Sequence, residues 1–348
     1  MRKDAMTFAW MDKMSTIPSS DGTLKICVAG PGAIGTTLAA LLGAGGQQVT
    51  VIARGESLKK IASSGVTLRQ PQRELHANVF ASDGNDIGIH DVLLLCSKAQ
   101  DLETLALASR NTIGPNTLIL PVVNGIPWWY FHGVTGRFAG RTVQSVDPDG
   151  ALATLLPPEQ TIGVVASFTA ERMGPGKAVA LNPIRMVLGE IDDISRNRTH
   201  LLVEIFNRCG IETRLSSRIR DPLWTKVTAN LMSNPLSVVA GAPLKHVCGR
   251  EDLSSISRRL IDEAMLVAAS FSARLEVDPD GLLQFGAGMG DAKTSMLQDY
   301  ESGRQLELEA ICEAVLELAS MQDIAMPLTK YISSLARYRS EAARSIAS

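Results

Sequence analysis

The chain has 348 residues, of which 45% are hydrophobic and 20% charged, and its formal net charge is −2. This length predicts two domains, and the near-neutral charge gives no electrostatic reason to expect a nucleic-acid or anionic-membrane partner. No apolar run reaches the roughly 18–20 residues that a membrane-spanning helix needs.

Residues 1–23 contain charges and a Pro-Ser-Ser-Asp-Gly cluster but no apolar core of signal-peptide type. They predict a disordered or loosely packed N-terminal extension. From residue 24 onward, short apolar runs alternate with helical patterns. We expect strands at 24–29, 48–53, 91–96 and 117–121, and helices ending near 44 and covering 56–64 and 101–110. Such alternation predicts a parallel sheet with helices on both faces.

The pattern changes after about residue 141. Strand-like segments separated by Gly and Pro are expected at 162–168, 177–181 and 185–188, and a helix at 196–208 and a strand at 211–215 are expected to complete the sheet. Beyond 217 the apolar residues recur every three or four positions, which predicts helices at 252–275, 295–319 and 327–344. We therefore predict a Rossmann-type α/β domain over 24–216 and an all-helical domain over 217–348.

Cysteine and histidine usage gives no indication of a metal site. The five cysteines are odd in number and scattered without a C-x-x-C pair, and the five histidines show no metal-ligand spacing. We expect no metal, and we expect buried thiols in a reducing, cytoplasmic compartment.

A glycine motif follows the first predicted strand. Gly30-x-Gly32-x-x-Gly35 lies between a strand and a helix, which is the context that a dinucleotide-binding motif requires. The first glycine permits a tight turn, the second lets the backbone approach a pyrophosphate, and the third lets the helix pack on the strand. The N–H groups of the first helical turn, at Ala33 and Ile34, would then face the phosphates.

The residue after the second strand indicates which cofactor is bound. An NAD site usually has Asp or Glu there, whereas this chain has Arg54, nineteen residues after Gly35, and no acid until Glu56. Because a guanidinium can bind a 2′-phosphate through paired hydrogen bonds, we predict NADP(H). The alternative is that Arg54 faces solvent and Glu56 binds the ribose.

Two further loops follow predicted strands of the sheet. Lys98, in Ser97-Lys98-Ala99, could reach a phosphate or ribose, and Asn124, before Gly125, could bind the nicotinamide ribose or the substrate. Both loops also fit a simpler role in starting helices.

A polar stripe is predicted in the second half of the chain. If 223–236 is helical, Lys226, Asn230 and Asn234 share one face. One ammonium and two carboxamides among apolar residues fit a surface that holds a small polar molecule. The alternative is a solvated polar face that ends at Pro235.

With these motifs in place, the chain resembles the ketopantoate reductase (2-dehydropantoate 2-reductase) family from about residue 24 to 335. The matching motifs are Gly30–Gly35, Ser97-Lys98-Ala99, Asn124-Gly125, Lys226 through Asn234-Pro235-Leu236, and Ser295-Met296-Leu297-Gln298-Asp299 with Glu307. The resemblance implies a Rossmann domain, a helical C-terminal domain of the 6-phosphogluconate dehydrogenase type, and an active site in the cleft between them. It also implies NADPH-dependent reduction of ketopantoate to pantoate, a step of pantothenate and coenzyme A biosynthesis.

The resemblance further implies roles for individual residues. Lys226 matches the general acid and Glu307 its acidic partner, while Asn230, Asn234 and Ser295 match substrate-holding groups. Asn124 matches the residue at the nicotinamide end. Hydride addition to a ketone leaves charge on its oxygen, and a lysine whose pKa is lowered in a dry cleft can stabilise and protonate that oxygen.

Other residues compete for two of these roles. The helix expected around Glu307 also offers Glu301, Glu309 and Glu313. Ser295 could equally be a helix cap.

One position departs from the family pattern. Leu244 stands where family members usually have an asparagine that also contacts the substrate. An apolar side chain cannot bond a hydroxyl, so the alternative function is a paralogous reductase of a different 2-oxo acid. An alternative from another class is a sensor that binds NADP(H) without turnover. The apolar C-terminal helices allow a homodimer but do not require one.

Overall fold

The computed structural model describes residues 22–347, so the expected extension at 1–23 lies almost wholly outside the described part of the chain. The described chain forms two compact units. Unit 1 comprises residues up to Val123 with His132–Gly140 and Gly150–Ile219, and unit 2 comprises Asn124–Phe131, Arg141–Asp149 and the chain from Arg220 onward. Two short segments from the first half of the sequence, 124–131 and 141–149, therefore belong to the second unit.

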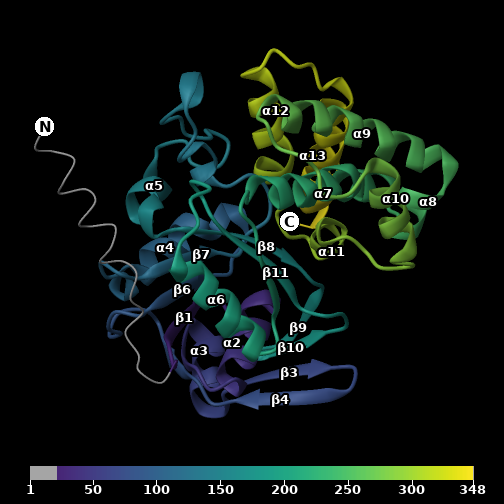
Figure 1. The fold of residues 1–348 in the computed structure, drawn as a ribbon. Coiled ribbons are helices and arrows are strands. Elements are labelled where there is room, and N and C mark those ends of the chain that lie inside the picture. Colours follow the sequence, from purple (N-terminus) through teal and green to yellow (C-terminus); the bar gives the residue numbers. More distant parts are fainter. Residues whose placement is uncertain (1–21, 348) are drawn as a thin grey trace, which may run out of the picture. The chain divides into compact units, whose positions relative to one another are not determined.

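Unit 1 is built on a five-stranded parallel sheet with the order β5-β2-β1-β6-β7 (Figure 1). Its strands are β1 (Lys25–Ala29), β2 (Gln48–Ile52), β5 (Phe80–Ser82), β6 (Val92–Leu95) and β7 (Leu118–Pro121). β6 and β7 are buried at every position, as is typical of parallel strands covered by helices on both faces. The predicted parallel sheet is confirmed.

Two smaller sheets complete unit 1. One has the order β4-β3-β10-β9, from β3 (Val66–Gln70), β4 (Arg73–Ala77), β9 (Ala170–Gly174) and β10 (Lys177–Ala180). The other has the order β12-β11-β8, from β8 (Ile162–Ser167), β11 (Arg185–Glu190) and β12 (Glu212–Leu215). The expectation that the later strands extend the main sheet is therefore wrong. β11 pairs antiparallel with β8, and a single bridge from Ile119 to Thr161 links this sheet to β7.

Helices surround these sheets. They are α2 (Ala33–Ala44), α3 (Gly55–Ser64), α4 (Leu102–Ser109), α5 (Ala151–Leu155) and α6 (Asn197–Arg208), with 3₁₀ turns η2 (Ala99–Asp101), η3 (Arg110–Thr112), η5 (Gly136–Phe138) and η6 (Pro158–Gln160). α2 packs against both the main sheet and the β4-β3-β10-β9 sheet, because leucines and alanines bury both its sides. The start of α6 is held by a buried ion pair in which Arg198 donates to both carboxylate oxygens of Glu190, at 2.9 and 2.5 Å.

Unit 2 is helical, as expected. Its long helices are α7 (Arg220–Ala240), α9 (Glu251–Ser270) and α13 (Pro327–Ala347), and shorter elements are α8 (Leu244–Gly249), α10 (Pro279–Gly288), α11 (Ser295–Glu301), α12 (Ala314–Ser320), the 3₁₀ turn η4 (Trp128–Phe131) and the π-helix η7 (Glu309–Glu313). α7 packs against α9, α13 and α11. Within residues 22–347, no helix is both long enough and apolar enough to cross a membrane.

Two details of unit 2 differ from expectation. The helix expected over 295–319 is broken, because α11 ends at Glu301 and a non-helical segment precedes the π-helix. α7 does not end at Pro235 but continues through it to Ala240. The proline has no N–H to donate to the preceding turn, and its side chain is buried within the helix.

Candidate functional site

The turn between β1 and α2 has the geometry of a dinucleotide-binding loop. Gly30 has φ +87°, and a Cβ there would lie 2.5 Å from the carbonyl oxygen of Cys96. A Cβ on Gly35 would lie 2.2 Å from the carbonyl oxygen of Gly30. A Cβ on Gly32, in contrast, would meet no atom within 4 Å. Packing therefore requires glycine at two of the positions, and the third leaves open space beside the backbone.

Hydrogen-bond donors are present on this turn and on the loop that follows β6. α2 begins without a side-chain cap at Gly32, so the N–H groups of its first turn, including those of Ala33 and Ile34, are available to an anion. Ser97 contributes a buried hydroxyl oxygen that has no hydrogen-bond partner in the described chain. Lys98, at the start of η2, is partly buried. Ser97 was not predicted as a binding residue, and only its neighbour Lys98 pointed to this loop.

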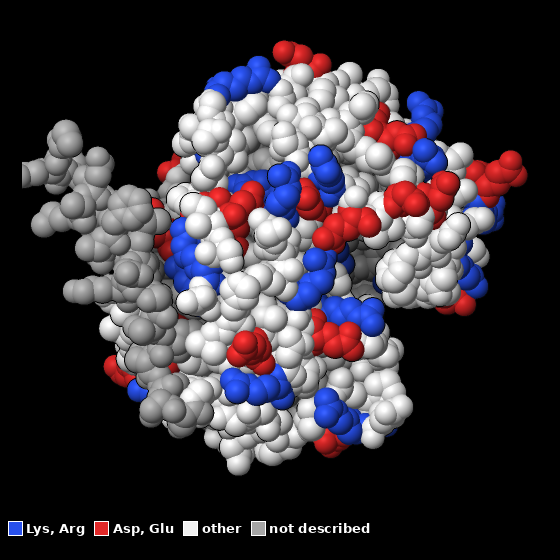
Figure 2. Space-filling view, in the orientation of Figure 1, with Lys and Arg blue, Asp and Glu red and all other residues white. Residues whose placement is uncertain are grey.

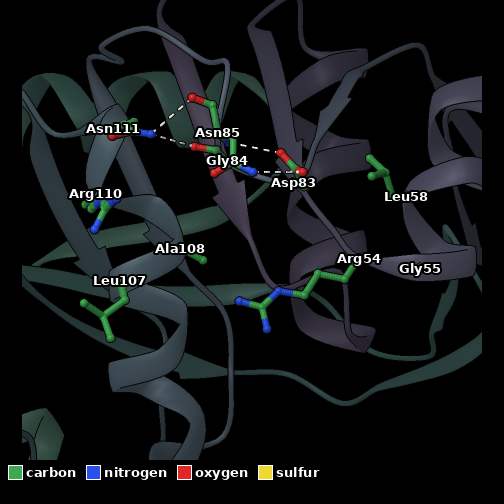
Figure 3. A pocket seen from close by; sticks show the side chains of 10 residues that line it. All are labelled: Arg54, Gly55, Leu58, Asp83, Gly84, Asn85, Leu107, Ala108, Arg110 and Asn111. Carbon is green, nitrogen blue, oxygen red and sulfur yellow. Dashed lines mark hydrogen bonds between the residues drawn. The ribbon is translucent and has the colours of Figure 1, made fainter.

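Arg54 lies directly after β2 and lines a pocket of about 450 Å³ within unit 1. The pocket is bordered by α3, by the 83–85 loop and by the end of α4 with η3; its lining residues are Arg54, Gly55, Leu58, Asp83, Gly84, Asn85, Leu107, Ala108, Arg110 and Asn111. Figure 3 shows the Arg54 side chain extended across the pocket toward the side formed by Leu107 and Ala108. The guanidinium is thus held over a hollow rather than against another side chain.

The acidic residue that lines this pocket is Asp83, and not Glu56, which the sequence offers as the alternative ribose ligand. Glu56, the alternative ribose ligand, lies exposed in the first turn of α3 and does not line the pocket. Asp83 does line it, but its carboxylate accepts hydrogen bonds from the backbone N–H and the side-chain amide of Asn85, at 3.0 and 3.1 Å (Figure 3). Asn111 fixes the same loop by donating to the carbonyl oxygens of Gly84 and Asn85.

The polar stripe of the second unit lies on α7, where Lys226, Asn230 and Asn234 share one face of the helix. Lys226 and Asn230 are partly exposed, whereas Asn234 is buried. The amide oxygen of Asn234 accepts a long hydrogen bond of 3.5 Å from Ser233, and its buried amide nitrogen has no partner in the described chain. A buried donor without an acceptor costs free energy, so this amide is poised to bind a ligand.

Lys226 has an unusual environment for a lysine. Removal of its ammonium from water lowers its pKa, and no neighbouring charge opposes that effect. Within residues 22–347 no salt bridge or hydrogen bond reaches the ammonium, so Lys226 is not paired with Glu307. A desolvated amine without a counterion gives up its proton more readily than a solvated lysine does.

Glu307 is distinguished from the competing glutamates by burial. It is 4% exposed and lies just before η7, which packs against α7. Glu309 and Glu313 both accept from Arg337, at 2.8 and 3.1 Å, and Glu301 is bound by a lysine on the surface. Of these four glutamates, Glu307 alone is buried.

Ser295 is the first residue of α11 and is exposed. The capping role belongs to its neighbour Thr294, whose side-chain oxygen accepts the N–H of Leu297 at 3.1 Å. Thr294 also exchanges a 2.6 Å hydrogen bond with Ser237 of α7. The alternative role of Ser295 as a cap is therefore wrong, and its hydroxyl remains available to a ligand.

Asn124 belongs to the helical unit, together with the residues of the stripe. Gly125 has φ +89°, and a Cβ there would lie 2.4 Å from the carbonyl oxygen of Ala310 in η7. The same carbonyl accepts the N–H of Ile126 at 2.9 Å. The π-helix thus presents a carbonyl that fixes the backbone on both sides of Gly125, and with it the position of Asn124.

The aromatic residues after Asn124 strengthen this attachment. Arg220 donates two hydrogen bonds, at 3.0 and 2.7 Å, to the carbonyl oxygen of Tyr130, and Trp224 of α7 donates to the Tyr130 hydroxyl at 2.8 Å. Trp128 and Trp129 are also buried in η4. The hydrogen-bond partners of Tyr130 therefore belong to unit 2, like Tyr130 itself.

The segment 141–149 is held in a similar way. The Glu317 carboxylate accepts the N–H groups of Gln144 and Ser145, each at 2.8 Å, and the Ser145 hydroxyl at 2.6 Å. This segment is partly buried, since Asp147 is 3% exposed.

Figure 2 shows Lys and Arg interspersed with Asp and Glu over the visible face, without an extended area of one sign. Among the described residues, no group of three or more His, Cys, Asp or Glu side chains is placed to hold a metal ion.

Comparisons with known proteins agree with this geometry. Residues 26–193 match the family model described as "Ketopantoate reductase PanE/ApbA", and residues 218–340 match "Ketopantoate reductase PanE/ApbA C terminal". The chain is 33% identical to a 2-dehydropantoate 2-reductase of Mesorhizobium japonicum, across 90% of this chain and 97% of the relative.

Solved structures give the same result. A ketopantoate reductase homologue of Ralstonia solanacearum MolK2 superposes with a TM-score of 0.86 at 28% identity, covering 93% of this chain and 99% of that one. A D-mandelate dehydrogenase structure with NADH and anilino(oxo)acetate shares the fold, with a TM-score of 0.79 at 19% identity, covering 92% and 99%. Because both family models match and together span most of the sequence, the chain belongs to the ketopantoate reductase family.

Proposed function

We propose that the protein reduces 2-dehydropantoate (ketopantoate) to pantoate with NADPH, a step of pantothenate and coenzyme A biosynthesis. The observation that carries this proposal is the desolvated, unpaired ammonium of Lys226, which shares a helix face with two amide side chains. A protein that only binds a nucleotide has no need for a desolvated proton donor on the same helix face as two amide side chains. The relatives named above support the choice of ketopantoate.

The residues of unit 1 fit a dinucleotide. The open space at Gly32, the uncapped start of α2 and the unpartnered hydroxyl of Ser97 would receive the pyrophosphate, and Lys98 would contact a phosphate or ribose. Arg54 would bind the 2′-phosphate, because its guanidinium lies over a pocket and is not held by a carboxylate. When bound, NADPH supplies the hydride.

The residues of unit 2 would manage charge and protons. Lys226 would first stabilise the developing charge on the keto oxygen and then transfer its proton to that oxygen. Asn230, the free amide nitrogen of Asn234 and the hydroxyl of Ser295 would hold the substrate's carboxylate and hydroxyl. Glu307 would be the buried acidic residue of the site, and Asn124 would lie at the nicotinamide end.

A related 2-oxo acid is a second candidate substrate. Leu244 begins α8 and is partly exposed, at a position where the family usually has an asparagine. Because leucine offers no hydrogen bond, ketopantoate would lose binding free energy at that point. A substrate with an apolar group there would lose less binding free energy. All five cysteines are free thiols, and we propose a cytoplasmic enzyme.

The test is NADPH oxidation with ketopantoate and a panel of 2-oxo acids, run beside NADH. We expect ketopantoate or a branched 2-oxo acid to be reduced, and Lys226→Ala to abolish turnover while binding NADPH normally. Lys245→Ala is the matched control, because Lys245 lies in the same unit but pairs with Asp291 at the surface. Full turnover by Lys226→Ala, or no oxidation by any 2-oxo acid, would refute the mechanism.

A second pair of variants tests the cofactor. Arg54→Gln should raise the KM for NADPH at least tenfold and leave that for NADH nearly unchanged, because only NADPH has the 2′-phosphate. Arg69→Gln changes an exposed arginine of β3 and serves as the control. Equal effects of Arg54→Gln on both cofactors would contradict the assignment.

A further inference from the structure

Two buried indole N–H groups, shortly after Asn124 in the chain, lack an acceptor. Trp128 and Trp129 are 4% and 3% exposed, and neither Nε1 atom has a hydrogen-bond partner in the part of the chain that the structure describes. An indole N–H can only donate, and a buried donor without an acceptor costs free energy. Buried tryptophans therefore usually find a partner for this group. The function proposed above uses neither side chain.

A third tryptophan of the same unit behaves differently. Trp224 on α7 is fully buried, and its indole N–H donates to the hydroxyl of Tyr130 at 2.8 Å. Over residues 22–347, the other buried side-chain atoms without a partner are Ser97 Oγ, Thr228 Oγ1 and Asn234 Nδ2. Ser97 and Asn234 are assigned to ligands above, and a threonine hydroxyl in a helix can turn to a carbonyl of the preceding turn. Unpartnered buried donors in this chain thus coincide with proposed ligand positions.

The segment that carries the two tryptophans is held at both ends by elements of unit 2. At one end, the N–H of Ile126 donates to the carbonyl oxygen of Ala310 in η7, at 2.9 Å. At the other end, the carbonyl oxygen of Tyr130 accepts two hydrogen bonds from Arg220 of α7. Because η7 packs against α7, the two tryptophans lie in a short, fixed stretch between these anchors.

The second anchor shows which side of α7 this segment covers. Arg220 and Trp224, which both bond to Tyr130, lie about 100° around the helix from the centre of the polar stripe. Arg220 also precedes Lys226 by six residues, or about 9 Å along the helix axis. The segment 124–131 therefore runs along a side of α7 that borders the stripe of Lys226, Asn230 and Asn234.

We propose that the Trp128–Trp129 pair donates a hydrogen bond to the carboxylate of the 2-oxo acid. The inference rests on the proposed function, in which Lys226 acts at the keto oxygen and a separate group must bind the carboxylate. A carboxylate only accepts hydrogen bonds, and its bonds to N–H donors are charge-assisted, so it matches a group that only donates. The site then selects 2-oxo acids with a free carboxylate over their esters and lactones.

The first experiment observes the indole groups directly. A nitrogen–proton correlation spectrum of the full chain, saturated with NADP⁺, should contain four indole signals, which single Trp→Phe variants assign. Ketopantoate cannot be reduced by NADP⁺, and its addition should move the signal of Trp128 or Trp129. The signal of Trp224 should stay in place, because that N–H already donates to Tyr130. Ketopantoyl lactone, which has no free carboxylate, should move neither signal.

Kinetics separates a ligand donor from a structural tryptophan. Trp128→Phe and Trp129→Phe keep an aromatic ring and remove the donor. At least one of them should raise the KM for ketopantoate by about 10- to 100-fold, with kcat changed by less than about threefold. Phe271→Leu is the matched control, because the Phe271 ring packs against Tyr130 and Phe131 of the same turn and offers no donor. It should lower the melting temperature and change KM by less than about twofold.

Failure of this inference differs from failure of the proposed function. If no 2-oxo acid oxidises NADPH, the proposed function is wrong. If ketopantoate is reduced but neither tryptophan signal moves, or neither variant raises KM, the function stands and the inference is overturned. A larger effect of the two variants on the NADPH dissociation constant than on the KM for ketopantoate would also overturn it, because the indoles would then serve the cofactor.

Discussion

Gly125→Ala perturbs the attachment of Asn124 to the helical unit without touching a side chain of the predicted site. The new Cβ would lie 2.4 Å from the carbonyl oxygen of Ala310 and 2.6 Å from its carbonyl carbon. Because real Cβ atoms essentially never approach closer than 3.0 Å, the two backbones must separate by at least about 0.6 Å. The positive φ of +89° adds about 1–2 kcal/mol of backbone strain for a residue with a Cβ.

That displacement predicts a specific kinetic result. A shift of about 1 Å in a positioning group can cost on the order of 100-fold in rate, so we expect kcat to fall by about 10- to 100-fold. The glycine motif and Arg54 belong to the other unit, and the affinity for NADPH should therefore change by less than about twofold. Steady-state NADPH oxidation gives kcat, and fluorescence titration gives the NADPH dissociation constant.

The control is Gly46→Ala. Gly46 has nearly the same φ, +86°, but a Cβ there would meet nothing within 4 Å. It therefore measures the cost of a positive φ without the collision. If Gly125→Ala folds and keeps full kcat, or if Gly46→Ala lowers kcat equally, the contact with Ala310 does not position Asn124.

Three other predictions concern charge. Lys226→Met should abolish turnover yet raise the melting temperature of the free enzyme. Burial lowers the pKa of Lys226, and each tenfold loss of proton affinity costs about 1.4 kcal/mol of stability at neutral pH. A lower melting temperature of the variant would contradict this reasoning. Arg198→Ala should destabilise unit 1 by about 3–5 kcal/mol in urea unfolding, because it leaves Glu190 buried without its main partner, whereas Arg185→Ala, in an exposed pair, should cost less than about 1 kcal/mol. Burial lowers the pKa of His90, so the unfolded chain binds the extra proton and stability should fall as the pH drops below about 6.5; a His90→Asn variant that keeps the same pH slope would refute this assignment.

The features that could be predicted from the sequence are those set by local chemistry. The glycine motif was found because three close approaches require glycine at fixed spacing, and two of the three contacts prove to be shorter than a Cβ permits. The polar face of α7 was found because helical periodicity places every fourth residue together. Arg54 was recognised from its position at the end of β2.

The features that could not be predicted depend on contacts between distant segments. Residues 124–131 follow a strand of the main sheet, and nothing in their own composition indicates that Ile126 bonds to a carbonyl of η7 or Tyr130 to Arg220. The π-helix itself has no signature in the sequence, since its residues resemble those of any helix. The unpartnered hydroxyl of Ser97 was missed for the same reason, because whether a serine is satisfied depends on its surroundings.

The polar face of α7 combines both kinds of feature. Its helical periodicity could be predicted from the sequence, whereas the missing partners of its polar groups could not. Elsewhere in unit 2 the buried polar groups are mostly satisfied, as where Glu263 accepts both backbone and hydroxyl donors at the start of α13. Lys226 has no counterion, and the amide nitrogen of Asn234 has no acceptor. Folding alone would favour replacing both by apolar residues, since each costs stability as it stands. Two unsatisfied polar groups on one face of one helix lower the stability of the fold. Such groups are expected at a site that binds a polar ligand.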